Sequence, residues 1–255
     1  MPAKLRAMCG RFIITTPPQA MRDLFAFREQ PNFPPRYNVA PTQPVPIVRM
    51  NAGFREFALV RWGLIPSWSK EMPQTLLINA RAETIAEKPS FRGAFRHHRC
   101  LMPADGFYEW RATPKGPKQP FLIRRRDGGP MAFTAIWDNW MTKDGSEIDT
   151  AAIVTTEANA TLAPIHHRMP VILDEKDFAL WLDPSTPEKE LLALLRPAPD
   201  DLLIAEPVST AVNRVANDDA SLIAAIDEQT AAALTTPEPP RRKPKPADDR
   251  QTDLF

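Results

Sequence analysis

The chain has 255 residues, of which 43% are hydrophobic and 25% charged, and its formal net charge is +1 at pH 7. No apolar run approaches the roughly 18 residues that a membrane-spanning helix needs, and the first eight residues lack the apolar core of a secretory signal. Two cysteines, Cys9 and Cys100, are too few for a disulfide framework in a chain of this length. The sequence therefore predicts a globular protein of the reducing cytoplasm, without a membrane segment.

The first half of the chain predicts strands with one early helix. Residues 10–15 are typical of a strand, and residues 17–27 are typical of a short helix with proline in its first turn. Residues 30–46 are rich in proline and asparagine, which favours an irregular loop. Residues 45–50 and 55–65 then predict two strands paired across an Asn-Ala-Gly turn.

The second half predicts a helix, then strands, then helices. Residues 88–98 have apolar positions at helical spacing behind a serine cap. Short strands separated by turn sequences such as RDGG and KDGS are expected at residues 99–110, 120–126, 130–138 and 149–158. Further helices are expected at 175–182 and 187–196. This order favours an α+β fold, in which mostly antiparallel sheets form the core and the helices are peripheral.

Charge is unevenly distributed along the chain. Residues 36–126 contain 16 Lys or Arg against 6 Asp or Glu, whereas residues 171–234 contain 4 against 13. Such an asymmetry indicates a basic face that could bind a polyanion such as a nucleic acid. The alternative is that these charges lie on different faces and cancel one another.

From about Thr235 the composition changes. The sequence TTPEPPRRKPKPADDR is rich in proline and charge and cannot build a core, so a disordered tail is expected over residues 235–255. The tail ends in QTDLF, which places Leu254 and Phe255, two large apolar residues, at the end of a polar tether.

Cys9 follows an internal methionine, Met8, and allows more than one chemistry. If Cys9 became the N-terminus, it would carry a free α-amine beside a thiol. An α-amine has a reference pKa of about 7.7–8.0, so part of it is neutral at pH 7 and can attack an aldehyde to form a Schiff base. The thiol can then close a thiazolidine ring. The alternatives are thiolate attack on an acyl group, which needs a neighbouring base, or a buried and inert cysteine.

Other stretches carry further candidate groups. Asn79 and Arg81, within NARAET, offer an amide that can orient a reacting group and a guanidinium that can clamp a phosphate. Glu109 lies among aromatic residues, where desolvation favours the protonated acid. His166 and His167 precede an apolar run and can carry protons near neutral pH.

Aromatic residues near arginines suggest contact with unpaired bases. Trp62 and Trp68 flank a glycine and a proline in RWGLIPSW. Each candidate also has a structural alternative: Arg81 and Glu83 could form a surface pair, Glu109 could partner an arginine, the histidines could face solvent, and the tryptophans could lie in the core. The sequence has neither a CxxC nor an H-x₃-H spacing, so no metal site is expected.

Taken together and in order, six motifs resemble the SOS-response-associated peptidase (SRAP) family: MCGRF, YNVAPTQ, RWGLIPSW, NARAET, RCLMPADGFYEW and HHRMPVIL. The resemblance implies an α+β fold whose antiparallel sheets form a barrel-like core with a groove for DNA. It also implies three regions along the chain: residues 1–8 as a leader or a mis-annotated start, residues 9–234 as the SRAP domain, and residues 235–255 as the tail.

The resemblance implies a protein that senses abasic sites in single-stranded DNA and shields them through a covalent bond to the ring-opened sugar aldehyde. The family's N-terminal cysteine matches Cys9, its amide matches Asn79, its glutamate matches Glu109, and its histidine matches His166. The implied activities are Schiff-base chemistry of the lyase type and self-cleavage of the leader, with no cofactor and no metal. The DNA-binding residues implied in this sequence are Arg11, Pro41, Trp68 and Arg81.

The family needs its cysteine first in the mature chain, whereas here it is ninth. Either translation starts at Met8 and that methionine is removed, which we favour, or residues 1–8 are a leader removed by self-cleavage. The C-terminal QTDLF resembles a peptide with which bacterial repair proteins dock on the replication sliding clamp. Gln251 would be its polar anchor, and Leu254 and Phe255 would fill an apolar pocket. A cytoplasmic, nucleoid-associated monomer is expected.

Two rival functions stay open on the sequence alone. The first is a cysteine peptidase acting in trans, with Cys9 as nucleophile and His166 as base. The second is a non-catalytic module that binds single-stranded DNA through its basic groove. Dependence on an aldehyde and on a free Cys9 amine would distinguish crosslinking from both.

Overall fold

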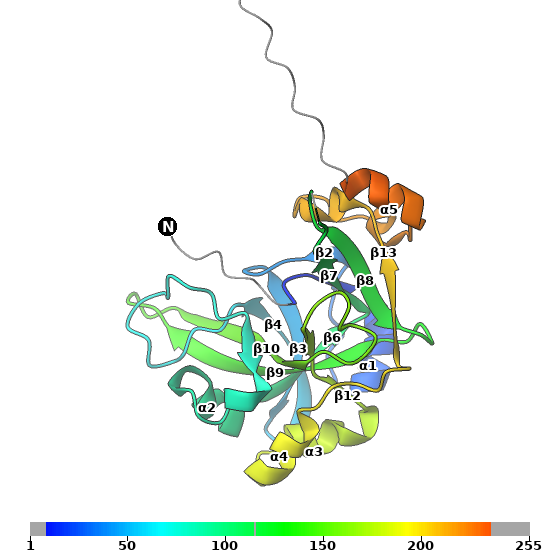
Figure 1. Cartoon of the computed structure of the whole chain (residues 1–255). Coiled ribbons are helices and arrows are strands. Elements are labelled where there is room, and N and C mark those ends of the chain that lie inside the picture. Colours follow the sequence, from blue (N-terminus) through cyan, green and yellow to red (C-terminus); the bar gives the residue numbers. More distant parts are fainter. Residues whose placement is uncertain (1–8, 115, 236–255) are drawn as a thin grey trace, which may run out of the picture.

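A computed structural model of the chain describes residues 9–114 and 116–235. Two sheets share one main hydrophobic core, and short helices lie at the periphery (Figure 1). The larger sheet has eight strands and the smaller has five. The predicted α+β class, with mostly antiparallel pairing, is confirmed.

Five strands of the larger sheet close into a barrel. They are β3 (Pro44–Asn51), β4 (Phe54–Trp62), β6 (Arg99–Ala104), β9 (Met131–Met141) and β10 (Glu147–Glu157). Strand β10 closes the ring because it pairs antiparallel with β9 and parallel with β4. The short strands at the margins of the barrel are β5 (Asn79–Arg81), β11 (Arg168–Pro170) and β12 (Ile172–Leu173).

The smaller sheet has the order β13-β8-β7-β1-β2. Its strands are β1 (Phe12–Ile14), β2 (Arg36–Val39), β7 (Gly106–Arg111), β8 (Gln119–Arg125) and β13 (Leu203–Pro207). Asp105 alone separates β6 of the barrel from β7, and its carboxylate accepts hydrogen bonds from the backbone nitrogens of Thr15 and Thr16. At Gly106 a side-chain carbon would approach the Ile123 carbonyl oxygen to 2.9 Å, so only glycine fits where the chain passes from one sheet to the other.

The helices are short and surround the sheets. They are α1 (Pro18–Phe25), α2 (Pro89–His97), α3 (Phe178–Leu182), α4 (Glu188–Leu194) and α5 (Glu228–Thr235), with 3₁₀ turns η1 (Ala82–Thr84), η2 (Glu175–Asp177), η3 (Thr210–Asn213) and η4 (Ala220–Ile223). In Figure 1, α3 and α4 lie at one end of the barrel and α5 lies beside the smaller sheet. Within the described ranges, no helix is long and apolar enough to cross a membrane.

Aromatic packing joins the two sheets near the start of the described chain. Phe12 of β1 is fully buried and makes edge contacts with Trp62 at 5.2 Å and with Phe133 at 6.2 Å between ring centroids. Phe107 of β7 contacts Phe133 as well, at 5.9 Å. The core therefore holds β1 and β7 firmly. Cys9 lies shortly before β1, and Glu109 lies in β7.

Most predicted elements are confirmed, and three predictions need correction. The predicted loop at 30–46 contains β2 and the start of β3, because sheet pairing outweighs its proline content. The predicted strand at 99–110 is two strands in different sheets. Helix α2 begins after Lys88 with Pro89 in its first turn, and Ser90 does not cap it. The expected leader at 1–8 and the tail after Thr235 lie outside the described residues.

Candidate functional site

Cys9 and Glu109 meet because β1 and β7 run antiparallel. Phe12 pairs with Phe107, and this register brings Cys9, three residues before Phe12, close to Glu109. The Cys9 backbone nitrogen donates a hydrogen bond to Glu109 Oε1 at 2.7 Å. Cys9 is 1% exposed and Glu109 is 3% exposed. A carboxylate thus lies directly against the nitrogen that would be the α-amine of a chain starting at Cys9.

Burial raises the pKa of Glu109 to about 7. Hydrogen bonds from the backbone nitrogens of Cys9 and Trp110 and the charge of Lys118 oppose this shift but do not cancel it. The predicted desolvation of Glu109 is therefore present in the fold. A carboxyl group with this pKa can both take and give a proton near neutral pH.

The Cys9 thiol is held in its neutral form. Burial raises its pKa well above the ordinary value, and the nearby Glu109 carboxylate raises it further. Cys9 also has a positive φ of 38°, a conformation that residues other than glycine adopt at some cost. The other cysteine, Cys100, lies fully buried in β6, where burial raises its pKa as well.

His166 lies just before β11, near the same Glu109 oxygen that accepts from the Cys9 nitrogen. Its Nδ1 atom is 3.9 Å from Glu109 Oε1, and its side chain is 12% exposed. The same Nδ1 is 3.2 Å from the Arg168 backbone nitrogen and 3.3 Å from the Arg168 carbonyl oxygen. A neutral Nδ1 can accept from the former, and a protonated one can donate to the latter. The two backbone groups of Arg168 thus accommodate both protonation states of Nδ1, which suits a proton carrier.

The neighbouring His167 is exposed, and its ring lies 4.5 Å from that of His166. No ion pair links His167 to Glu109 in the part of the chain that the structure describes. Between the two histidines, the structure therefore brings only His166 to the Cys9–Glu109 pair.

Asn79 and Arg81 share one face of β5. The strand runs parallel to β10, with Asn79 opposite Ile153 and Arg81 opposite Thr155. Ala80, between them, points into the core, so both polar side chains point away from it. Asn79 is half-buried and Arg81 is exposed, as a residue that binds DNA phosphate needs to be.

A partly buried ion pair ties η1, which directly follows β5, to the segment that carries His166. Arg168 of β11 binds both carboxylate oxygens of Glu83, with Nη2–Oε2 at 2.9 Å, and donates to the Thr155 carbonyl oxygen at 2.6 Å. Arg168 lowers the pKa of Glu83 through this pair. The suggested surface pair between Arg81 and Glu83 is wrong, because the side chain that bonds to Glu83 is that of Arg168. Arg168 lies within HHRMPVIL, but its role was not predicted, because its partner Glu83 is 85 positions away in the sequence.

Removing Glu83 is expected to lower the free energy of unfolding more than removing Arg168. Arg168 has a side-chain exposure of 9%, whereas Glu83 has 45%. Glu83→Ala leaves a buried unpaired guanidinium and should cost about 3 kcal/mol in free energy of unfolding. Arg168→Met leaves a carboxylate that water can reach and should cost less. Urea denaturation of both variants would measure this, and equal or reversed losses would contradict the asymmetry.

The other predicted DNA contacts lie in different settings. Arg11 is half-buried, and its Nη1 donates to Asn38 Oδ1 at 2.7 Å and to the Val212 carbonyl oxygen at 2.9 Å. Pro41 lies in the turn between β2 and β3 and is half-buried. Trp68 is 65% exposed. Trp62 is fully buried, so for Trp62 the core alternative is correct.

Among the residues placed by the structure, no group of three or more His, Cys, Asp or Glu side chains is arranged to hold a metal ion. Cys9, Glu109 and His166 instead form a cluster in which protons can move near the Cys9 nitrogen. The nitrogen of Cys9 faces a carboxyl group that titrates near neutrality, and a histidine lies next to that carboxyl.

Comparisons with known proteins identify the family of the chain. The family model described as SOS response associated peptidase (SRAP) matches residues 8–215. The chain is 37% identical over 221 residues to the abasic site processing protein YoqW of Bacillus subtilis, covering 85% of this chain and 99% of that protein. It is 33% identical over 257 residues to the abasic site processing protein HMCES of Gallus gallus, covering 83% and 76%.

Solved structures share the fold. A protein from Bacteroides thetaiotaomicron matches with a TM-score of 0.79 and 28% identity, over 86% of this chain and 100% of that one. A phage-related protein from Bordetella bronchiseptica matches with a TM-score of 0.64 and 30% identity, over 78% and 94%. The motifs, the fold and the family match agree, and the chain belongs to the SOS response associated peptidase (SRAP) family.

Proposed function

We propose that this protein senses abasic sites in single-stranded DNA and crosslinks to them through the N-terminal amine and thiol of mature Cys9. The observation that carries the proposal is the 2.7 Å hydrogen bond from the Cys9 nitrogen to Glu109, a carboxyl group whose pKa is about 7. The relatives at 33–37% identity are named abasic site processing proteins, which supports the choice of DNA lesion.

The first step joins the amine to the sugar. The neutral α-amine of Cys9 attacks C1′ of the ring-opened sugar aldehyde, and the nitrogen gives up a proton to Glu109. Glu109 returns that proton to the aldehyde oxygen, which becomes a hydroxyl. The second proton of the nitrogen follows by the same route, so the oxygen leaves as water and the neutral Schiff base remains. Burial raises the pKa of Glu109 toward neutrality, which eases proton transfer in both directions.

The second step closes the ring. The Cys9 sulfur bonds to C1′, and its proton passes to the imine nitrogen, which gives a thiazolidine. In total, an aldehyde and an aminothiol yield a thiazolidine and one water. Burial raises the pKa of the Cys9 thiol, which favours the amine as the first nucleophile in this scheme.

The surrounding residues have supporting roles in this scheme. His166, next to Glu109, protonates or stabilises the sugar oxygen during ring opening. Asn79 orients the reacting groups, and Arg81 binds a backbone phosphate from the exposed face of β5. Trp68, Pro41 and Arg11 complete the proposed set of DNA-binding residues.

The amine must be free for this chemistry, because a peptide nitrogen does not form a Schiff base. We favour a chain that starts at Met8 and loses that methionine, with self-cleavage of residues 1–8 as the second route. The buried, protonated Cys9 thiol is poorly suited to thiolate attack, which weighs against a peptidase acting in trans.

Intact mass spectrometry tests the proposal. The purified protein is measured alone and after incubation with a single-stranded oligonucleotide that contains one abasic site. We expect a mature chain starting at Cys9 and a stable adduct of protein plus oligonucleotide minus one water. A mature Cys9 terminus that forms no adduct would overturn the crosslinking function, and cleavage of added peptides would then favour the peptidase.

The C-terminal QTDLF is proposed to dock the protein on the replication sliding clamp. Gln251 supplies a polar anchor, and Leu254 and Phe255 fill an apolar pocket, while the tether lets the domain reach DNA. Deletion of residues 251–255 should abolish clamp binding in surface plasmon resonance and leave crosslinking in solution unchanged. Unchanged clamp affinity in the truncated protein would refute the docking role.

A further inference from the structure

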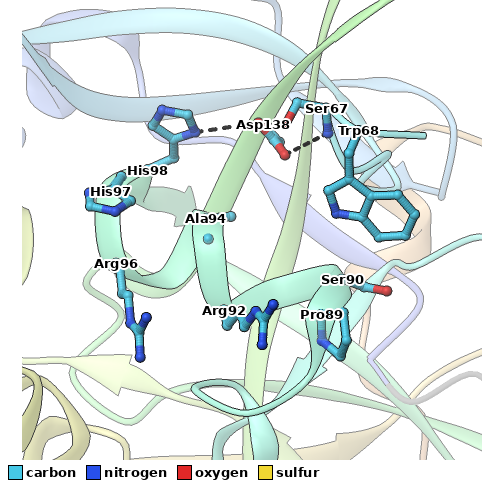
Figure 2. Close-up of a pocket in the computed structure, with 11 residues that line it drawn as sticks. Ser67, Trp68, Pro89, Ser90, Arg92, Ala94, Arg96, His97, His98 and Asp138 are labelled. Carbon is cyan, nitrogen blue, oxygen red and sulfur yellow. Dashed lines mark hydrogen bonds and ion pairs between the residues drawn. The ribbon is translucent and has the colours of Figure 1, made fainter. Parts of the chain in front are cut away.

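The chain at Cys9 lies between two neighbouring elements of the smaller sheet. Strand β1 has β7 on one side and β2 on the other, and Phe12 pairs with Phe107 and with Val39. Both pairings are antiparallel, so the chain before Phe12 runs between Glu109 of β7 and the turn that follows Val39. Among the described residues, none that lines the groove beside α2 (Figure 2) belongs to β1, β2 or β7. The surroundings of Cys9 are therefore separate from that groove.

The turn that follows β2, residues 40–43, is strained; we call it the β2–β3 turn. A hydrogen bond from the Gln43 nitrogen to the Ala40 carbonyl oxygen, at 3.2 Å, closes it around Pro41 and Thr42. Thr42 has a φ of 75°, at a position where a turn with a preceding proline usually has glycine. A β-branched residue adopts this conformation at a cost, so the surrounding structure must impose it.

The side chain of Gln43 holds the β2–β3 turn in this conformation. Its Oε1 accepts a hydrogen bond from the Ala40 backbone nitrogen at 3.0 Å and a second one from Arg36 Nη2 at 2.9 Å. The same oxygen thus ties the start of the turn to its end and to β2. An alanine in place of Gln43 would break both bonds, and the strain at Thr42 could then relax.

The backbone of the β2–β3 turn is tied to the aromatic core beneath β1. The Thr42 nitrogen donates to the Trp62 carbonyl oxygen at 2.8 Å, and the Trp62 nitrogen donates to the Gln43 carbonyl oxygen at 3.0 Å. Trp62 is fully buried, and its ring contacts that of Phe12 at 5.2 Å between centroids. Phe12 follows Cys9 by three residues, so the turn and the reacting residue share one support.

Arg36 is itself fixed by the C-terminal part of the fold. Its Nε pairs with Oδ2 of Asp218, whose Oδ1 accepts from the backbone nitrogens of Tyr37 and Asn38. The side chains of Arg36 and Asp218 are only 22% and 24% exposed, so water screens this pair less than an exposed one. The contacts from Asp218 through Arg36 to Gln43 therefore end in the β2–β3 turn.

We propose that Gln43 is a positioning residue for the crosslinking reaction. Held by Arg36 and Asp218, it keeps the β2–β3 turn in the strained form that confines the reacting sugar against Cys9, opposite Glu109. Confinement matters because displacing a reacting group by about 1 Å can slow a reaction about 100-fold. This role rests on the proposed function, since only crosslinking requires a sugar to be held beside Cys9.

The maximal rate of crosslinking tests this role separately from DNA affinity. Single-turnover reactions at saturating single-stranded oligonucleotide with one abasic site would compare the wild type, Gln43→Ala, Gln43→Glu and Gln19→Ala, which removes an exposed glutamine of α1. Gln43→Ala should lower the maximal rate about 10- to 100-fold. Gln43→Glu keeps an oxygen that accepts from Ala40 and Arg36, so its rate should stay within about three-fold of the wild type. Gln19→Ala should match the wild type.

Propanal shows whether the effect concerns the placement of the strand. This small aldehyde can form a thiazolidine with the amine and thiol of mature Cys9 without any confinement of a DNA strand. Intact mass would follow its adduct, protein plus propanal minus one water, and Gln43→Ala should form it at the wild-type rate. Equal slowing of Gln43→Ala with propanal and with DNA would overturn the proposal, because the damage would then lie in the Cys9 cluster. A wild-type rate of Gln43→Ala with DNA would overturn it as well.

Asp218→Asn tests the same chain of contacts from its far end if Gln43→Ala does not fold. Asparagine keeps an oxygen for the backbone nitrogens of β2 but loses the charge that holds Arg36. It should crosslink DNA at least about three-fold more slowly and react with propanal like the wild type. An unchanged rate with DNA would overturn the proposal. If the wild type forms no DNA adduct, the proposed function fails and the role of Gln43 falls with it.

Discussion

Cys9→Ala in the mature protein is expected to eliminate the stable abasic-site adduct completely. Alanine keeps the α-amine but removes the sulfur, so the reaction should stop at a Schiff base, which hydrolyses. Borohydride reduction should still trap that Schiff base, and gel electrophoresis under denaturing conditions would measure both species. A chain that cannot lose residues 1–8 should form neither species, because its Cys9 nitrogen remains a peptide nitrogen.

The matched control for this result is the other cysteine. Cys100 is fully buried in β6 and has no place in the proposed chemistry. Cys100→Ala should therefore retain the wild-type adduct yield, although it removes a buried sulfur from the core. Stable, heat-resistant adducts in Cys9→Ala, or their loss in Cys100→Ala, would contradict crosslinking through the Cys9 thiol.

Glu109→Gln is expected to slow adduct formation by about 10² to 10⁴, the usual contribution of a positioned proton-transfer group. Glutamine has nearly the same shape but neither accepts nor returns the proton. Single-turnover rates with an abasic oligonucleotide would measure the loss, and anisotropy with an intact oligonucleotide should show that DNA affinity stays within about two-fold. A rate within about three-fold of the wild type would refute the role of Glu109.

Glu109→Gln, although it should slow the reaction, is expected to raise the stability of the fold at alkaline pH. In the chain that retains residues 1–8, burial raises the pKa of Glu109 from an ordinary 4.5 to about 7. The folded state then binds a proton that the unfolded state has lost, so the contribution of this group is favourable below pH 4.5 and disappears as pH rises through 7. Glu109→Gln should therefore be more stable than the wild type at pH 8, by up to about 3 kcal/mol, and close to it at pH 4.5.

Urea denaturation at the two pH values would measure this difference. Glutamine cannot pair with the Cys9 nitrogen as a carboxylate does, which makes 3 kcal/mol an upper bound. The quantity to compare is the free energy of unfolding of Glu109→Gln minus that of the wild type. If this difference is smaller at pH 8 than at pH 4.5, burial does not disfavour the charged form of Glu109. The expected opposition of rate and stability is typical of a group that is buried for catalysis.

The sequence by itself determined the fold class, most of the elements and the identity of the candidate site residues. Two strand-like runs on either side of an Asn-Ala-Gly turn predicted the β3–β4 hairpin, and six ordered motifs identified the family. These features are local: they depend on the residue types within a short window and on their spacing. For the same reason, the segment at 30–46 was assigned wrongly, since its strand β2 exists only through its pairing with β1.

Only the tertiary structure decided which of those residues meet. Cys9 and Glu109 are 100 positions apart, and the antiparallel register of β1 and β7 places the nitrogen of one against the carboxylate of the other. The partner of Glu83 is Arg168, 85 positions away, instead of its neighbour Arg81. Such pairings depend on sheet register and on burial, which also raises the pKa of Glu109. Desolvation is a property of the packed core around a group, and residue spacing along the chain does not encode it.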